Sequence, residues 1–292
     1  MRLLLTGADG FTGVHLTEAA SKAGFEVFPL KSDLSNAGAL IEEVAQIAPT
    51  HVIHLAGISA VTHADQQELY KVNLFGTLNL LDALLKVKGS IQKIILASSA
   101  NVYGNVIAGP HSISEDLCTL PVNQYAMSKL AMEYMARSYL DNLPIVFTRP
   151  FNYTGVGHDT RFVIPKIIEH FKNNAPIIEL GNMTVQREYN DVRNVCDIYL
   201  ALLKLSQVGE VYNICSGRTS SLNLVIAELR RLTGQTMEVR VNPSFVRKNE
   251  IEVLAGNPEK LESCIGAIHW RPLEDTLSWM LGSPKAIDKM SI

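Results

Sequence analysis

The first half of the chain alternates between short apolar runs and longer segments with helical spacing. The segments 13–23, 37–47, 65–85 and 124–140 carry apolar residues three and four positions apart, as helices that face a core do. The runs before and between them are short and apolar, as strands buried on both faces are, and they cover 2–6, 26–30, 51–55, 93–97 and 145–148. This alternation predicts an α/β fold with a doubly wound parallel sheet.

Composition narrows the class of protein further. The 292 residues include 26 Lys and Arg against 29 Asp and Glu, so the chain lacks the basic excess that nucleic acid binding demands. No apolar run approaches the ~20 residues that span a membrane, and the N-terminus does not show a signal-peptide pattern. We therefore expect a cytoplasmic protein without nucleic acid or membrane partners. The four cysteines are spaced too widely for a zinc site or a disulfide framework, so no metal is expected.

A glycine-rich turn follows the first predicted strand. Gly7, Gly10 and Gly13 are spaced three residues apart, and a helical segment begins at the last of them. Gly7 permits a tight turn, Gly10 lets a pyrophosphate approach the backbone, and Gly13 lets the helix pack on the strand. The helix N-terminus in turn attracts negative charge. This context predicts a dinucleotide ligand, and glycines that merely end a strand are the alternative.

The residues after the second strand bear on the choice between NAD and NADP. A carboxylate there accepts the ribose 2′-hydroxyl, whereas a basic residue tolerates a 2′-phosphate. Lys31 and Ser32 favour the phosphate, whereas Asp33 lies near the offset expected of a ribose-binding acid. Asp33 or Ser35 could instead cap the next helix. The predicted cofactor is therefore NADP or NAD, with the balance slightly toward NADP.

A Tyr and a Lys four residues apart provide candidate acid–base chemistry. On a helix, Tyr125 and Lys129 lie on one face, where the ammonium could lower the pKa of the phenol from about 10. Ser98 and Ser99 follow the fourth strand, at the sheet edge where doubly wound folds bind ligands. A hydroxyl there could bind a substrate carbonyl beside Tyr125, and a serine-capped turn without chemistry is the alternative.

Four further motifs carry a resemblance that covers nearly the whole chain: His54-Leu55-Ala56-Gly57, Val72-Asn73-Leu74-Phe75-Gly76-Thr77, Arg149-Pro150-Phe151-Asn152, and Arg187-Glu188-Tyr189-Asn190-Asp191-Val192-Arg193. With the glycine turn and the Tyr/Lys pair, the chain resembles the extended short-chain dehydrogenases, a family of nucleotide-sugar epimerases, dehydratases and ketoreductases. Because the pattern becomes irregular after Pro150, we place the change of region there. The resemblance implies a Rossmann dinucleotide-binding domain over 1–152. A smaller α/β region for the nucleotide-sugar follows over 153–292, with some segments returning to the Rossmann domain.

The resemblance also implies roles for particular residues. Ser99, Tyr125 and Lys129 would be catalytic, and Asp33 and Leu34 could form the pair that contacts adenine. Asn101, Asn152, Arg187 and Arg247 would contact the substrate, the two arginines at its diphosphate, and a solvated or ion-paired arginine is the alternative for each. The residues expected at the cofactor are Gly7, Gly10, Phe11, Gly13, Lys31, Asp33, Leu34, Leu55, Ala56, Gly57, Tyr125, Lys129 and Pro150.

Asn101 separates the possible reactions. Dehydratases of the resembled family usually carry an acid two residues after the catalytic hydroxyl, and an amide cannot donate the proton that the departing hydroxyl needs. A reductase, the reverse dehydrogenase and a 4-epimerase remain.

Segments 209–217, 242–247, 256–261 and 270–272 are similar to the branch that reduces GDP-4-keto-6-deoxy-mannose, although 247–250 and 267–269 depart from it. A non-catalytic dinucleotide-sensing module is the alternative from another class.

Two expectations concern residues outside the chemistry. Segments 65–85 and 124–140 match helices that form a four-helix interface in the resembled family, which implies a homodimer, and simple packing on the sheet is the alternative. His54 ends a strand near the cofactor, and we expect it to be a hydrogen-bonded core residue rather than a catalytic one.

Overall fold

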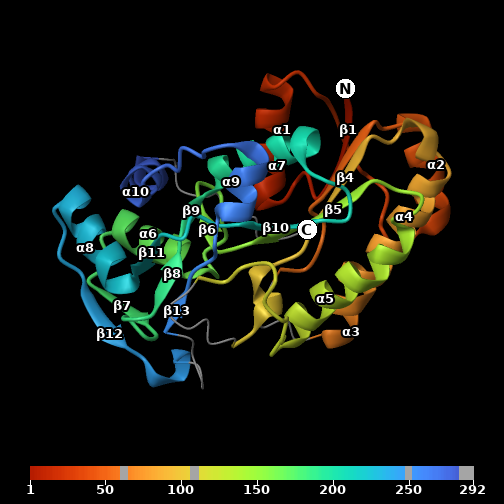
Figure 1. Cartoon of the computed structure of the whole chain (residues 1–292). Coiled ribbons are helices and arrows are strands. Elements are labelled where there is room, and N and C mark those ends of the chain that lie inside the picture. Colours follow the sequence, from red (N-terminus) through yellow and green to blue (C-terminus); the bar gives the residue numbers. More distant parts are fainter. Residues whose placement is uncertain (60–64, 106–111, 247–251, 283–292) are drawn as a thin grey trace.

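A six-stranded parallel sheet organises the computed structural model, which describes residues 1–59, 65–105, 112–246 and 252–282 (Figure 1). Arg247 lies outside the described residues. Across the sheet the order is β2 (Glu26–Pro29), β1 (Arg2–Thr6), β3 (His51–His54), β4 (Lys93–Ala97), β5 (Ile145–Pro150) and β10 (Val211–Ile214). The order reverses between β1 and β3, the point where doubly wound sheets open a ligand crevice. The predicted doubly wound fold is confirmed.

Helices cover both faces of this sheet. On one face lie α1 (Phe11–Lys22), α7 (Val192–Leu205) and α9 (Glu259–Ile265), and on the other α2 (Ala37–Ile47), α4 (Thr77–Leu85) and α5 (Gln124–Ala136). Strand alternation explains the two cores: in β4, Ile95 and Ala97 pack toward α1 and α7, whereas Ile94 and Leu96 pack toward α2, α4 and α5. The helix that carries Tyr125 and Lys129 therefore lies on the opposite face of the sheet from α1.

Two predicted helices are subdivided in the structure. The segment 65–85 forms α3 (Gln66–Tyr70), a π-helix at Lys71–Gly76 and then α4. An added Cβ on Gly76 would lie 2.9 Å from the Leu34 Cβ, so close tertiary packing accompanies the wider turn. The segment 124–140 is helical only to Ala136 and continues as a 3₁₀ turn at Arg137–Tyr139.

The second half of the chain adds a smaller group of elements at the left of Figure 1. Its short strands form the sheets β11–β8–β13, β12–β7 and β6–β9. Buried side chains of α6, α8 and α10 share one core with strand β7. The elements are β6 (Tyr153–Thr154), α6 (Val163–Lys172), β7 (Ile177–Leu180), β8 (Gln186–Glu188), β9 (Asn190–Asp191), β11 (Thr219–Ser221), α8 (Leu222–Thr233), β12 (Glu238–Val241), β13 (Val253–Leu254) and α10 (Leu273–Gly282).

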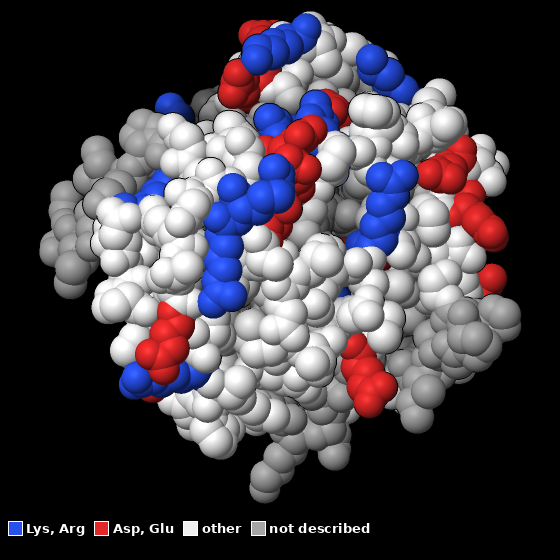
Figure 2. Space-filling view, turned by 90° about the vertical axis from the view of Figure 1, so that its left-hand side faces the viewer, with Lys and Arg blue, Asp and Glu red and all other residues white. Residues whose placement is uncertain are grey.

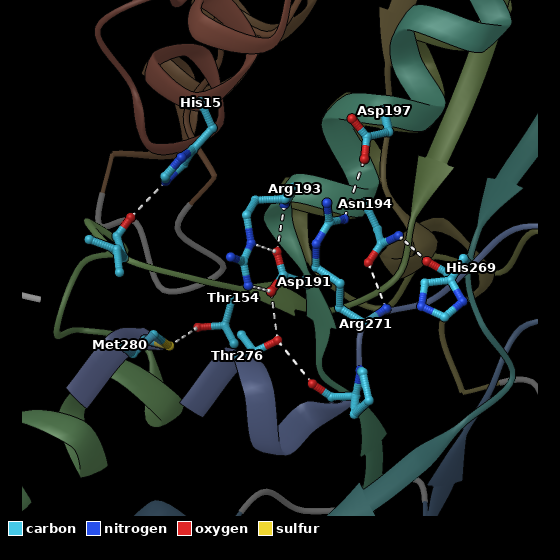
Figure 3. Close-up of polar contacts among 12 residues, drawn as sticks. His15, Thr154, Asp191, Arg193, Asn194, Asp197, His269, Arg271, Thr276 and Met280 are labelled. Atoms are coloured by element: carbon cyan, nitrogen blue, oxygen red, sulfur yellow. Dashed lines mark hydrogen bonds and ion pairs between the residues drawn. The ribbon is translucent and has the colours of Figure 1, made fainter. Parts of the chain in front are cut away.

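A buried carboxylate joins the smaller group to the main sheet (Figure 3). Asp191 caps α7 and pairs with Arg193, whose Nη2 lies 2.7 Å from Oδ2. Thr276 of α10 donates to the same oxygen at 2.7 Å. Burial alone would raise the pKa of Asp191, but these hydrogen bonds hold it below its usual value. Asn194 of α7 also contacts the segment before α10, by donating to the His269 carbonyl oxygen at 2.9 Å.

Nucleic acid and membrane partners place requirements on the distribution of charge and on the apolar character of the helices. In Figure 2, basic and acidic side chains are interspersed over a predominantly uncharged face. Among the described residues, none of the helices combines the length and the apolar character needed to cross a membrane.

Candidate active site

The glycine turn between β1 and α1 has the shape that a dinucleotide requires. Gly7 has a φ of +67°, and an added Cβ would lie 2.9 Å from the Ala56 backbone nitrogen. An added Cβ on Gly13 would lie 2.0 Å from the Gly7 carbonyl oxygen, so only glycine lets α1 approach this closely. Gly10 is the N-cap of α1 and makes no side-chain cap, which leaves the first N–H groups of the helix available to an anion. The residues present therefore fit a pyrophosphate.

In the loop after β2, side-chain oxygens accept hydrogen bonds from nearby backbone nitrogens. Asp33 accepts a hydrogen bond from the Ser35 backbone nitrogen at 2.7 Å, and this bond lowers the pKa of Asp33. The N-cap of α2 is Asn36, which accepts from Ala39 N, so neither Asp33 nor Ser35 fills the capping role considered from the sequence. Leu34 packs against Gly76, so this loop lies beside the π-helix.

Ser99, Tyr125 and Lys129 come together at the carboxyl end of β4. All three side chains are buried, and the Ser99 side chain lies near enough to the Tyr125 phenol to influence its pKa. The Lys129 Nζ donates to the Ala97 carbonyl oxygen at 2.9 Å. An added Cβ on Gly57 would lie 3.1 Å from that Nζ, so the loop after β3 packs directly on the ammonium. The geometry places a hydroxyl, a phenol and an ammonium in one buried cluster.

Burial sets the protonation of this cluster. It raises the pKa of the Tyr125 phenol, and the polar influence of the Ser99 side chain opposes this only in part. The expectation that Lys129 lowers the phenol pKa is therefore not met in this structure, because desolvation outweighs other influences. Burial also lowers the pKa of Lys129 to about 8, against the raising effect of Glu133. Near neutral pH the phenol keeps its proton and the ammonium keeps its charge.

A chain of hydrogen bonds connects the strand ends behind the cluster. The Ala56 N–H donates to Thr6 Oγ1, which lies 2.7 Å from His54 Nδ1. On the other side, His54 Nε2 lies 2.9 Å from Thr77 Oγ1, which donates to the Asn73 carbonyl oxygen. This pattern is satisfied by a neutral imidazole with its proton on Nε2. His54 is thus a hydrogen-bonded core residue, as predicted.

Asn73 links these hydrogen bonds to α5, the helix that carries Tyr125 and Lys129. Its Oδ1 accepts from Ile58 N at 2.8 Å, and its Nδ2 donates to the Ile58 carbonyl oxygen and to Ser128 Oγ. Ser128 is adjacent to Lys129, and Asn73 lies within the π-helix. One asparagine therefore fixes the loop after β3 against α5.

We expect acid to destabilise the protein through His54. Burial lowers its pKa to about 3 from the usual 6.5, so its contribution to stability is complete above pH 6.5 and declines as the pH falls toward 3. Going from about pH 7 to about pH 5.5, the free energy of unfolding should fall by about 1.2 kcal/mol more in the wild type than in His54→Gln. Urea unfolding at the two pH values measures this difference. Equal losses in both proteins would contradict a buried neutral imidazole.

The predicted substrate residues occupy different positions. Asn101 is exposed and donates from Nδ2 to Ser99 Oγ at 3.1 Å. Asn152 is exposed after β5, and its carbonyl oxygen accepts from Asn190 N. Arg187 lies on β8, where its Nη1 donates to the Gln186 carbonyl oxygen. Arg187 is thus on a different element from the Ser99 cluster.

Two groups of residues near the cluster were not assigned from the sequence. Tyr153, directly after Asn152, donates to or accepts from Thr12 Oγ1 at 2.8 Å and stacks on Phe11, which ties β6 to the glycine turn. Glu133, one turn after Lys129, pairs with Arg149 in the core. Lys129 and Glu133 are four residues apart on one helix face, and this spacing is the sequence signal that could have indicated Glu133. Among the described residues, no cluster of His, Cys, Asp and Glu could hold a metal ion.

A family comparison identifies the class of protein. The model of the NAD dependent epimerase/dehydratase family matches residues 3–215. The chain belongs to this family, as the sequence motifs predicted, and is an NAD(P)-dependent enzyme.

Individual relatives narrow the class to enzymes named for nucleotide-sugars. The chain is 32% identical over 271 residues to GDP-6-deoxy-D-talose 4-dehydrogenase of Aggregatibacter actinomycetemcomitans, which covers 91% of this chain and 92% of the relative. It is 33% identical over 284 residues to GDP-6-deoxy-D-mannose reductase of Pseudomonas aeruginosa. That alignment covers 93% of this chain and 92% of the relative. The solved structure of RMD from Pseudomonas aeruginosa complexed with NADPH superposes with a TM-score of 0.88 at 32% identity, over 96% of this chain and 97% of that one.

Proposed function

We propose that this enzyme reduces the C4 carbonyl of a GDP-linked 4-keto-6-deoxyhexose with a reduced nicotinamide cofactor, or runs the same step in reverse. Support comes from the two curated relatives, which carry this chemistry in their names and align over more than 90% of each chain. The reaction moves one hydride and one proton, so the protein must orient the carbonyl and supply the proton.

The hydrogen bonds at Ser99 carry the proposal. Its Oγ accepts from the backbone nitrogen and from the side-chain Nδ2 of Asn101. With its lone pairs used in this way, the Ser99 hydroxyl is left to donate its own proton, toward Tyr125 or a carbonyl oxygen. Asn101 cannot act as the acid that elimination of water needs, which favours a reaction without dehydration.

Each residue of the cluster has a part in this reaction. When bound, the cofactor supplies or accepts the hydride. Ser99 orients the sugar carbonyl, and Tyr125 donates its proton to the oxygen at C4. The raised pKa of Tyr125 keeps that proton in place until it is needed. Lys129 stabilises the phenolate that remains, and its contact with the Ala97 carbonyl oxygen fixes the position of the ammonium.

For the substrate, we propose that Asn152 contacts the sugar-nucleotide and that Arg187 contacts its diphosphate. Asn152 follows β5 at the carboxyl edge of the sheet, and Arg187 provides a positive charge on β8. A guanidinium suits a diphosphate because it offers paired donors.

We also propose a homodimer formed by the π-helix Lys71–Gly76 and α5. Large apolar side chains are exposed on these elements, namely Phe75, Met127, Tyr134 and Met135. Exposed apolar side chains that gather on neighbouring helices are typical of an interface. Sedimentation equilibrium should give twice the mass of one chain, and a single-chain mass would contradict this proposal.

The test of the function is nicotinamide absorbance after purified protein is mixed with freshly generated GDP-4-keto-6-deoxy-mannose and either NADH or NADPH. We expect loss of one equivalent of reduced cofactor per sugar converted. Conversion of a nucleotide-sugar with the cofactor unchanged at the end would instead identify an epimerase. Binding of cofactor without conversion of any nucleotide-sugar would point to the dinucleotide-sensing module.

A further inference from the structure

The loop after β2 is bound by a carboxylate from within the chain. Glu43 lies on α2, and its Oε1 accepts from the Lys31 backbone nitrogen at 2.9 Å. Its Oε2 accepts from the Ser32 backbone nitrogen at 2.7 Å. The backbone N–H groups of Lys31 and Ser32 are therefore both occupied by one anionic side chain.

These N–H groups lie where the dinucleotide is distinguished from its 2′-phosphorylated form. In sheets of this kind, residues after the second strand contact the adenosine ribose, and a 2′-phosphate needs donors and positive charge there. The Lys31 and Ser32 N–H groups would be suitable donors, but a phosphate could use them only by displacing Glu43. A ribose 2′-hydroxyl, in contrast, can donate its hydrogen to a carboxylate.

The surrounding charges also disfavour a phosphate. A groove of about 550 Å³ runs between β2 and α2, and Lys31, Glu42 and Glu43 line it. Asp33 adds another negative charge in the same loop, and its pKa is held below the usual value mainly by the Ser35 N–H. Burial raises the pKa of Glu43, but hydrogen bonds from Ser32 and Lys31 and the Lys31 ammonium hold it below its usual value. Glu43 is therefore ionised, and its negative charge lies at the two N–H groups that a phosphate would need.

We propose that Glu43 is a specificity-determining residue for the cofactor, and that its carboxylate selects NAD over NADP. The side chains of Lys31 and Ser32, considered alone, favour NADP instead. The role of Glu43 rests on the proposed dinucleotide site but not on the sugar substrate. The selecting carboxylate comes from the helix that follows the strand, not from the strand's own end.

Cofactor binding tests this proposal without sugar. Titration of the protein with NADH and NADPH, followed by nicotinamide fluorescence, should show NADH binding at least about tenfold more tightly. Glu43→Gln should reduce this ratio by about tenfold, because the amide keeps the size of the side chain but lacks its charge. Glu42→Gln removes a charge from the same groove but leaves in place the hydrogen bonds that Glu43 accepts from the Lys31 and Ser32 N–H groups, so it should lower the ratio less than Glu43→Gln does.

A second measurement uses the wild-type protein alone, in case Glu43→Gln disturbs the loop. Displacement of NADH by 5′-AMP should require less nucleotide than displacement by adenosine 2′,5′-bisphosphate. Equal or tighter binding of the bisphosphate or of NADPH would overturn the role of Glu43. Tight NADH binding without any turnover of the keto-sugar would leave the inference standing and contradict the proposed reaction instead.

Discussion

Tyr125→Phe should lower kcat by about 10²–10⁴-fold while the Kd of the cofactor stays nearly constant, because positioned proton transfer contributes that much and the phenyl ring keeps its packing. The Tyr125 phenol is buried against Ser99 and is the one proposed proton donor at C4. Steady-state kinetics and fluorescence titration give the two quantities separately.

Tyr139→Phe is the matched control for this substitution. It removes a phenolic hydroxyl from the turn that follows the same helix, where the hydroxyl donates to Asp82 at 2.8 Å. Turnover by Tyr139→Phe should equal that of the wild type. If Tyr125→Phe also kept wild-type turnover, Tyr125 would not be the proton donor.

Glu133→Ala should destabilise the fold by about 3–5 kcal/mol, since it leaves a buried guanidinium without its counter-charge. Arg149 donates from Nε and Nη2 to the two Glu133 oxygens at 3.0 and 2.7 Å. Its Nη1 donates to the Tyr103 hydroxyl, which donates to Asn213 of β10. Burial would lower the pKa of Arg149, but Glu133 raises it, so the guanidinium keeps its charge. Chemical denaturation measures the loss.

The double substitution Glu133→Leu with Arg149→Met distinguishes two explanations for the stability lost in Glu133→Ala. If the loss comes from an unpaired buried charge, replacing both partners with apolar residues should restore most of the stability that Glu133→Ala removes. If the double variant were as unstable as Glu133→Ala, the packing around the pair rather than its charge would determine stability.

Much of the main sheet could be predicted because its strands are buried on both faces. Residues 2–6 and 93–97 form strands with the predicted bounds, and helix 37–47 also agrees. In these segments Leu3, Leu4, Ile94 and Ile95 are fully buried, so hydropathy alone marks them.

The second half of the chain could not be predicted in the same way. Its strands are two to four residues long, and β8 pairs with both β11 and β13, which lie far away in sequence. Such pairing depends on tertiary structure rather than on local pattern. The π-helix likewise accompanies the approach of Gly76 to Leu34, two segments that are distant in the chain.

Within the candidate site, the sequence indicated the residues but not their electrostatics. The four-residue spacing placed Tyr125 and Lys129 on one face, and both are buried beside Ser99. The direction of the Tyr125 pKa shift could not be predicted, because it depends on how completely the fold removes water from the phenol. Glu43 was not recognised because its contact with the loop after β2 depends on how α2 packs against the sheet.

Direct hydride transfer to C4 is the central claim, and isotopic labelling tests it most directly. The protein would be incubated with GDP-4-keto-6-deoxy-mannose and reduced cofactor carrying deuterium in the transferable position of the nicotinamide ring. We predict a product with deuterium at C4 and one equivalent of oxidised cofactor. A product without deuterium at C4, or converted sugar without net oxidation of the cofactor, would contradict the proposed reduction.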